Sequence, residues 1–164
     1  RTLEKVQLYH CPANAQADAA MHQAFSDLAS GGDENPVLKI EAREIKALRK
    51  AGGVVWFDFA TLCGGPRSQN DYLELATQFH TVLLSGVPQM FVRHASEARR
   101  FTWLIDVLYD RSVKLICSAA VPPEQLYTEG PLAGEFKRTV SRLNEMQTAE
   151  YLAKPHRQVD TAIT

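Results

Sequence analysis

Residues 79–119 constrain the fold more than any other part of the sequence. Two short apolar runs, at 81–84 and 113–117, have the length and composition of buried strands. The residues between these runs repeat apolar side chains at helical spacing: Phe101, Leu104, Ile105 and Leu108. Ser96 is a candidate N-cap for this helix. Two buried strands joined by one helix predict a βαβ unit with parallel strands and a right-handed crossover.

Further amphipathic helices are expected on both sides of this unit. Asn14 is a suitable N-cap for a helix that Gly31 would end. Ser68, followed three residues later by Asp71, approximates a capping box for a second helix. A last helix has an apolar face made of Phe136, Val140, Leu143 and Met146.

Residues 37–59 allow two interpretations. The runs 37–40 and 54–59 have the composition of strands, and Gly52-Gly53 marks a turn before the second. Residues 41–50 contain good helix formers, but the short turns on both sides favour adjacent antiparallel strands. The favoured fold is therefore α/β: a mixed sheet that contains the βαβ unit and a β-meander, flanked by helices.

The composition is that of a water-soluble globular protein with one domain. The chain has 164 residues, of which 45% are hydrophobic and 23% charged. The formal net charge of −1 provides no global basic field that would attract nucleic acid or an anionic membrane. Residues 1–152 are expected to form the domain, and the polar residues 153–164 a frayed tail. Because the chain begins at Arg1 on strand-like residues, we expect it to be a piece of a longer protein.

The three cysteines indicate a reducing, cytoplasmic environment. Cys11, Cys63 and Cys117 are odd in number and show no CxxC spacing. His10 and His80 could join cysteines as metal ligands, but no pair has the spacing of a known zinc site. Packed thiols and hydrogen-bonded histidines are therefore the favoured interpretation, and no metal ligand is predicted. Both tryptophans, Trp56 and Trp103, are expected in the core.

Asp58 is a candidate site residue because it ends the apolar run VVWFDF. A carboxylate at the carboxyl end of a strand is typical of Mg²⁺-binding acids. The next residue is Phe59 rather than a second acid, so a solvent-facing aspartate at a strand end is the favoured alternative. The phosphate-binding motif GxxxxGK[ST] is absent from the sequence, and no catalytic residue is predicted.

Two pairs of arginines are candidate anion contacts. Arg138 and Arg142 lie one helical turn apart, and such a pair suits a phosphate or an acidic partner. The alternative is a solvated helix face in which Glu135 and Glu145 offset the two charges.

Arg99 and Arg100 open the central helix, where the helix dipole disfavours cations. This local conflict indicates an anionic partner, unless Glu97 or Asp106 supplies the compensating charge.

Four phrases of the sequence, in this order, resemble a known family: VVWFDFATLCG, DYLELATQFHTVLLSGVP, EARRFTWLIDVLYDRSVKLICSAAVPPEQLY and FKRTVSRLNEMQTAEYL. Over about residues 1–152 they are similar to the C-terminal half of the Afg-type (ATPase family gene one-like) AAA ATPases. The resemblance implies that the parent protein binds and hydrolyses ATP with Mg²⁺, using a P-loop half that precedes this region. It also implies that the present chain is the C-terminal α/β domain, packed against that half and binding no cofactor by itself.

Members of this family are linked to the bacterial division ring and to mitochondrial protein quality control. The expected partners are therefore the N-terminal ATPase half and possible division-ring or other proteins, with at most peripheral membrane association. Arg138 and Arg142 fall in an R-x-x-x-R stretch of the family, so one of them is expected to reach a nucleotide phosphate or an interdomain acid. Two functions follow: an accessory domain of an ATPase, inactive alone, or a module that binds a protein partner independently of nucleotide.

Overall fold

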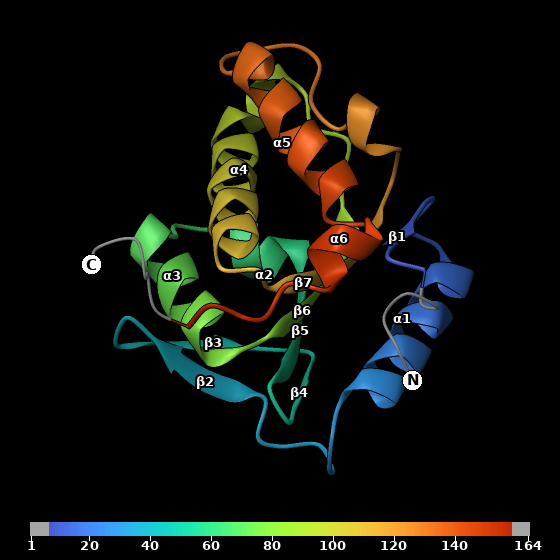
Figure 1. Cartoon of the computed structure of the whole chain (residues 1–164). Helices are drawn as coiled ribbons and strands as arrows, with labels where there is room; N and C mark the ends of the chain where they lie inside the picture. The colour runs from blue at the N-terminus through green and yellow to red at the C-terminus, as the bar shows by residue number, and fades with distance from the viewer. Residues whose placement is uncertain (1–6, 159–164) are drawn as a thin grey trace.

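The central sheet has five strands in the order β1-β7-β6-β5-β4 (Figure 1). The computed structural model describes residues 7–158. The strands are β1 (Tyr9–His10), β4 (Arg49–Ala51), β5 (Val54–Asp58), β6 (Thr81–Val87) and β7 (Lys114–Ala119). The pairs β1-β7, β7-β6 and β6-β5 are parallel. Only the pair β5-β4 of this sheet is antiparallel. The predicted mixed sheet in an α/β fold is confirmed.

The βαβ unit consists of β6, α4 (Ala95–Asp110) and β7. The two strands are parallel, with Thr81 opposite Lys114, as predicted. The predicted N-cap is wrong: a short 3-10 helix, η2 (Val92–His94), leads directly into α4, so Ser96 lies inside the first turn. The predicted apolar face of α4 is buried, namely Phe101, Leu104, Ile105 and Leu108.

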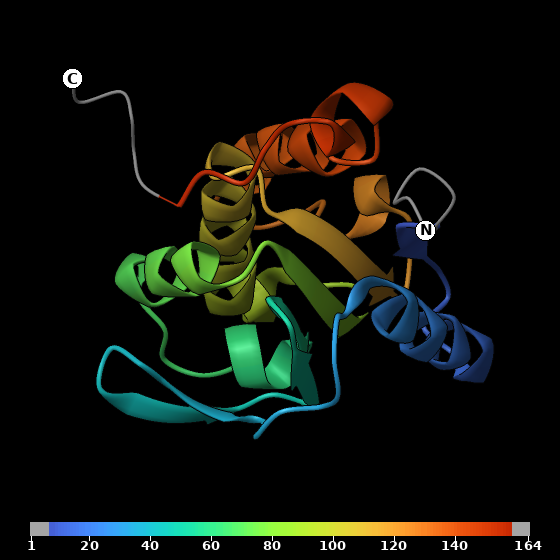
Figure 2. The same cartoon turned by 60° about the horizontal axis from the view of Figure 1, so that its bottom comes forward.

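Helices cover both faces of the sheet, as Figure 2 shows. Side chains alternate along each strand, so Trp56 and Leu83 pack with Phe25 of α1 (Ala15–Leu28) on one face. On the other face, Phe57 and Leu84 belong to a larger core that includes the helices α2 (Phe59–Cys63), α3 (Gln69–Gln78), α4, α5 (Ala133–Glu145) and α6 (Ala149–Leu152). The short 3-10 helix η3 (Pro123–Gln125) follows β7.

The ambiguous segment is extended, but it forms two hairpins instead of one continuous meander. β2 (Val37–Ile40) and β3 (Arg43–Lys46) make a separate two-stranded sheet, whereas β4 joins β5 in the central sheet. The chain changes partner between Ala47, whose N–H donates to the Pro36 carbonyl, and Leu48, whose N–H donates to the Trp56 carbonyl. The strand interpretation of residues 41–50 is therefore confirmed, with a break after β3.

The helix caps follow the sequence closely at two positions. The Asn14 side chain accepts from the backbone N–H of Ala17 at 2.9 Å, as expected of an N-cap. Ser68 and Asp71 form the predicted capping box. α1 ends earlier than Gly31 would require, because Ala29 already has an extended conformation.

Residues 154–158 pack against the domain, which differs from the expected frayed tail. The Lys114 Nζ atom donates to the carbonyls of Tyr151 (3.0 Å) and Lys154 (2.8 Å). The Arg157 N–H donates to the Arg111 carbonyl at 2.8 Å. Residues 159–164 of the expected tail lie outside the described residues. Between residues 7 and 158, no helix combines the length and the apolar character that crossing a membrane requires.

Candidate functional site

A cavity of about 440 Å³ is lined by four arginines from three separate segments. We call it the arginine cleft, and its lining residues are Arg43, Pro66, Arg67, Ser68, Ser96, Arg99, Arg100 and Trp103. Arg43 comes from β3, residues 66–68 from the loop before α3, and residues 96–103 from the N-terminal half of α4. The fold therefore brings the predicted Arg99 and Arg100 together with two arginines that the sequence did not indicate.

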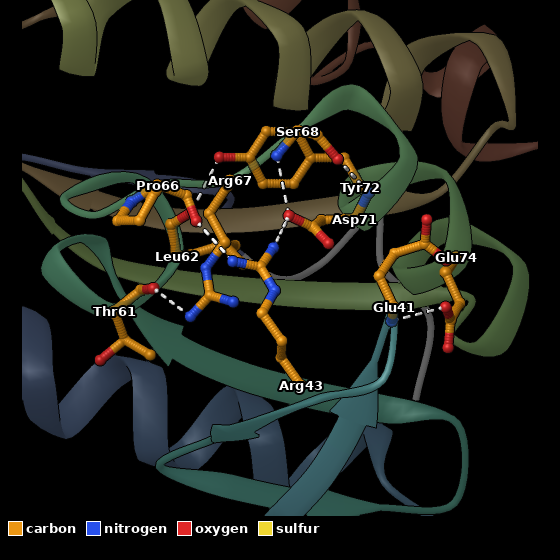
Figure 3. A network of polar contacts seen from close by, with 10 residues as sticks. All are labelled: Glu41, Arg43, Thr61, Leu62, Pro66, Arg67, Ser68, Asp71, Tyr72 and Glu74. Atoms are coloured by element: carbon orange, nitrogen blue, oxygen red, sulfur yellow. Dashed lines mark hydrogen bonds and ion pairs between the residues drawn. The ribbon is translucent and has the colours of Figure 1, made fainter.

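Arg43 is fixed at the edge of the cleft by two hydrogen bonds, both drawn in Figure 3. Its Nη2 atom lies 2.6 Å from Oδ2 of Asp71, and its Nη1 atom donates to the Pro66 carbonyl at 3.1 Å. The Asp71 side chain is only 2% exposed, and the same oxygen also accepts from the Ser68 N–H. The carboxylate thus holds β3 against the first turn of α3.

Backbone carbonyls hold two further arginines. Arg67 donates to the Thr61 carbonyl at 3.3 Å, and Arg100 donates through Nε to the Cys63 carbonyl at 2.7 Å. The Nε atom of Arg67 is buried and has no hydrogen-bond partner among the described residues. The side chain of Arg99 is exposed, and it has no hydrogen bond or ion pair with any of residues 7–158. The cleft therefore holds donors that the surrounding chain does not satisfy.

The electrostatics of the cleft favour an anion. Arg43 pairs with the buried Asp71 and also interacts electrostatically with Glu41. Arg67, Arg99 and Arg100 form no ion pair among residues 7–158. Arg99 and Arg100 also lie in the first turns of α4, where the helix dipole adds to the positive potential. Forked guanidinium groups match the geometry of phosphate and carboxylate oxygens. The arrangement can bind and orient an anion.

Cys63 lies beside the cleft but is not an activated nucleophile. Its side chain is fully buried, and desolvation raises the pKa of the thiol to about 12, although a hydrogen bond with the Tyr72 hydroxyl acts in the opposite direction. The Tyr72 hydroxyl lies 3.8 Å from Cys63 Sγ and donates to the Leu62 carbonyl at 2.8 Å. The packed thiol predicted from the sequence is therefore the appropriate description.

Arg138 and Arg142 lie outside the arginine cleft and share one partner, Asp106 of α4. Arg142 forms a hydrogen bond with Asp106 and also lies over the Tyr109 ring, 4.8 Å from its centroid. Arg138 lies 3.4 Å from Asp106 and keeps 64% of its side chain exposed. The compensating charge for this pair is thus on α4, and Glu145, which the sequence suggested, instead accepts from the Tyr109 hydroxyl.

The remaining candidates have structural partners. Asp58 caps α2, and its carboxylate accepts from the Thr61 N–H at 2.7 Å. His80 forms a hydrogen bond between Nδ1 and the Thr81 hydroxyl at 2.8 Å. No group of three or more His, Cys, Asp or Glu side chains within residues 7–158 could hold a metal ion. Trp56 is buried as predicted, but Trp103 is only partly buried and lines the cleft.

Sequence comparison identifies similar proteins over nearly the whole chain. The family model for AFG1-like ATPase matches residues 1–155. Cell division protein ZapE of Escherichia coli strain K12 is 42% identical over 157 residues, which cover 95% of this chain and 42% of ZapE. Lactation elevated protein 1 homolog B of Danio rerio is 32% identical over 180 residues, which cover 88% of this chain and 36% of that protein. The chain thus spans about two fifths of the length of these curated relatives. No solved structure matches.

Proposed function

Because this chain belongs to the AFG1-like ATPase family, we propose that it is the accessory α/β domain of an ATP-hydrolysing protein that acts in cell division. In this proposal a P-loop region outside the 164 residues binds ATP with Mg²⁺. The present domain has no ATP turnover by itself, and it packs against that N-terminal ATPase half in the cytoplasm. The cell-division role rests on the name of the 42% identical relative.

The proposal rests on one observation: this chain belongs to an ATPase family, but its sequence contains no phosphate-binding loop. The sequence has no GxxxxGK[ST], and the described residues include no cluster that could hold a metal ion. Asp58, at the end of a buried strand, is engaged in capping α2. The residues present therefore do not fit a site that hydrolyses Mg-ATP, and we derive no hydrolytic step from them.

The contribution of this domain, in our proposal, is cationic. The arginine cleft presents three arginines that have no ion-pair partner among residues 7–158, on an ordered frame of backbone and Asp71 contacts. Such a surface suits an anion or an acidic side chain of the ATPase half.

A protein-interaction module is the second candidate function. Of the five large apolar side chains that are exposed among the described residues, three are Phe91 at 45%, Val92 at 56% and Leu132 at 41%. A Cβ atom added at Gly130 would lie 3.3 Å from the Val92 Cα atom, so the loop that leads to Leu132 lies next to the η2 segment. An exposed apolar patch of this kind favours binding of a protein partner, such as a division-ring protein.

ATP turnover distinguishes the accessory domain from a self-sufficient enzyme. It would be measured for the 164-residue chain and for a longer family polypeptide that carries this chain together with a P-loop region. We expect turnover only from the longer polypeptide. Turnover by the 164-residue chain that increases with its concentration, and that persists after a second purification step, would overturn the proposal.

A further inference from the structure

We propose that the arginine cleft is a binding site for the diphosphate group of a small phosphorylated ligand. This inference goes beyond the accessory function, because binding would be a property of this chain alone and would need no P-loop. It rests on the charge, donor geometry and size of the cleft.

The charge of the cleft suits a diphosphate better than a single carboxylate. A phosphate monoester carries about −1.5 to −2 charges at pH 7, and a second phosphate adds about one more. The three cleft arginines without an ion-pair partner among residues 7–158, namely Arg67, Arg99 and Arg100, match this total, whereas one Asp or Glu side chain would pair with only one of them. The nearest carboxylate, Asp71, is already paired with Arg43.

The four arginines of the cleft differ in how firmly hydrogen bonds hold their guanidinium groups. Arg43 is held by Asp71 and the Pro66 carbonyl, and Arg67 by the Thr61 carbonyl, as Figure 3 shows. Their guanidinium groups therefore form a fixed floor of the cleft. Arg100 is attached through Nε only, which leaves its two terminal nitrogens without a partner among residues 7–158. Arg99 has no such attachment there. Ligand oxygens would therefore meet a preformed floor and two arginines whose donors are available.

The size and the apolar wall of the cleft indicate a small organic ligand. Its volume of about 440 Å³ lies within the range of about 300–1,000 Å³ that is typical of small-molecule sites. Trp103 and Pro66 supply apolar surface beside the guanidinium groups. A flat group attached to the diphosphate could pack against the Trp103 ring.

Isothermal titration of the 164-residue chain with pyrophosphate, ADP and citrate tests the inference. We expect saturable binding of one pyrophosphate per chain, and citrate, which presents carboxylates, should bind at least about tenfold more weakly. ADP binding as tight as pyrophosphate would show that the diphosphate is the recognised group. ADP binding more than about fivefold tighter, with the excess lost in Trp103→Leu, would show that a nucleoside adds contacts. Either result supports the site.

Arg99→Ala is the diagnostic variant, because Arg99 is exposed and its removal leaves the fold intact. We expect it to weaken pyrophosphate binding about five- to tenfold with an unchanged Tm. Arg99→Lys keeps the charge but loses the fork, so it should weaken binding about threefold. Arg93→Ala is the matched control: it removes an exposed arginine of η2 that does not line the cleft, and binding should change less than twofold.

Three results would overturn the inference. The first is no saturable binding at about 1 mM pyrophosphate. The second is an equal loss of pyrophosphate affinity in Arg99→Ala and Arg93→Ala, which would show that binding depends on the overall positive charge of the chain and not on the cleft. The third is citrate binding as tightly as pyrophosphate, which would make the cleft a carboxylate site for an acidic protein segment. None of these results depends on ATP turnover, so the inference and the proposed function can fail separately.

Discussion

Arg43 and Asp71 form an ion pair across 28 residues of sequence, with 2.6 Å between Nη2 and Oδ2. The same carboxylate oxygen accepts from the backbone N–H of Ser68 at 2.8 Å and so completes the capping box of α3. One buried side chain therefore joins the small β2-β3 sheet, the start of α3 and the floor of the arginine cleft.

Asp71→Asn should lower the free energy of unfolding by about 1–3 kcal/mol. The substitution keeps the size of the side chain but removes the buried charge that pairs with Arg43. Urea denaturation measures the effect. Asp33→Asn is the control, because Asp33 pairs with Arg49 at the surface and its loss should destabilise the chain much less than Asp71→Asn. Equal effects of the two substitutions would show that burial of Asp71 adds nothing.

Arg142→Ala should be more destabilising than Arg138→Ala, although both residues contact Asp106. Arg142 is 24% exposed and also covers the Tyr109 ring, whereas Arg138 is 64% exposed. We expect a loss of about 1 kcal/mol for Arg142→Ala and of less than about 0.5 kcal/mol for Arg138→Ala in urea denaturation. The reverse order would contradict the structural role assigned to Arg142.

The prediction that one of these two arginines contacts a nucleotide phosphate or an interdomain acid needs a different measurement. Both would be replaced by glutamine in a polypeptide that also carries the P-loop region of the family. We expect weaker ATP affinity or slower turnover, beyond what the loss of stability explains. If affinity and turnover are unchanged, the pair serves only to hold α5 against α4.

The folded chain should expose one reactive thiol. Cys11 is exposed, whereas Cys63 and Cys117 are buried and burial raises the pKa of each thiol to about 12. The thiolate is the reactive form, so at pH 8 a chromogenic disulfide reagent should label one cysteine per folded chain and three after denaturation. Cys11→Ser should abolish labelling of the folded chain. Rapid labelling of that variant would mean that Cys63 or Cys117 is accessible.

The free energy of unfolding should fall as the pH rises from about 9 to 12. Burial raises the pKa of Cys63 and Cys117 to about 12 and raises the pKa of Tyr72 and Tyr151 further. The folded chain therefore keeps protons that the unfolded chain releases, which makes the slope of stability against pH negative in this range. Lys114 acts in the opposite sense, because burial lowers its pKa, but it is a single group.

Chemical denaturation at a series of pH values measures this slope. Cys117→Ala removes one of the titrating groups, so its slope should be smaller than that of the unchanged chain. An unchanged slope would show that Cys117 does not contribute to the alkaline loss of stability.

The parts of the fold that could be predicted depend on local pattern. The βαβ unit follows from apolar runs and helical spacing within 41 residues, and the capping box of Ser68 and Asp71 is a four-residue pattern. The start of α4 could not be predicted from Ser96, because η2 leads the chain into the helix and the Phe91 N–H is satisfied by the His94 side chain instead. Residues 41–50 divide between two sheets because the chain changes partners at Ala47, a tertiary effect that local propensity does not contain.

The site was predictable only in part, for the same reason. Arg99 and Arg100 could be selected because cations conflict with the helix dipole at the start of α4. Arg67 is adjacent to a recognisable capping box, and that position could have indicated its proximity to a helix start. No local signal identifies Arg43, which reaches the cleft only because the β2-β3 hairpin packs on α3 through Asp71.

The pairing of β1 with β7 determines when the chain can complete its fold during synthesis. Tyr9 lies opposite Cys117, so the partner of the first strand emerges from the ribosome about 100 residues later. At about 5–20 residues per second, this delay is about 5–20 s. During that interval Met21 and Phe25 of α1 have no complete sheet to cover, since they pack with residues of β5, β6 and β7. The apolar face of α1 therefore stays without its complete sheet surface until β7 has been synthesised.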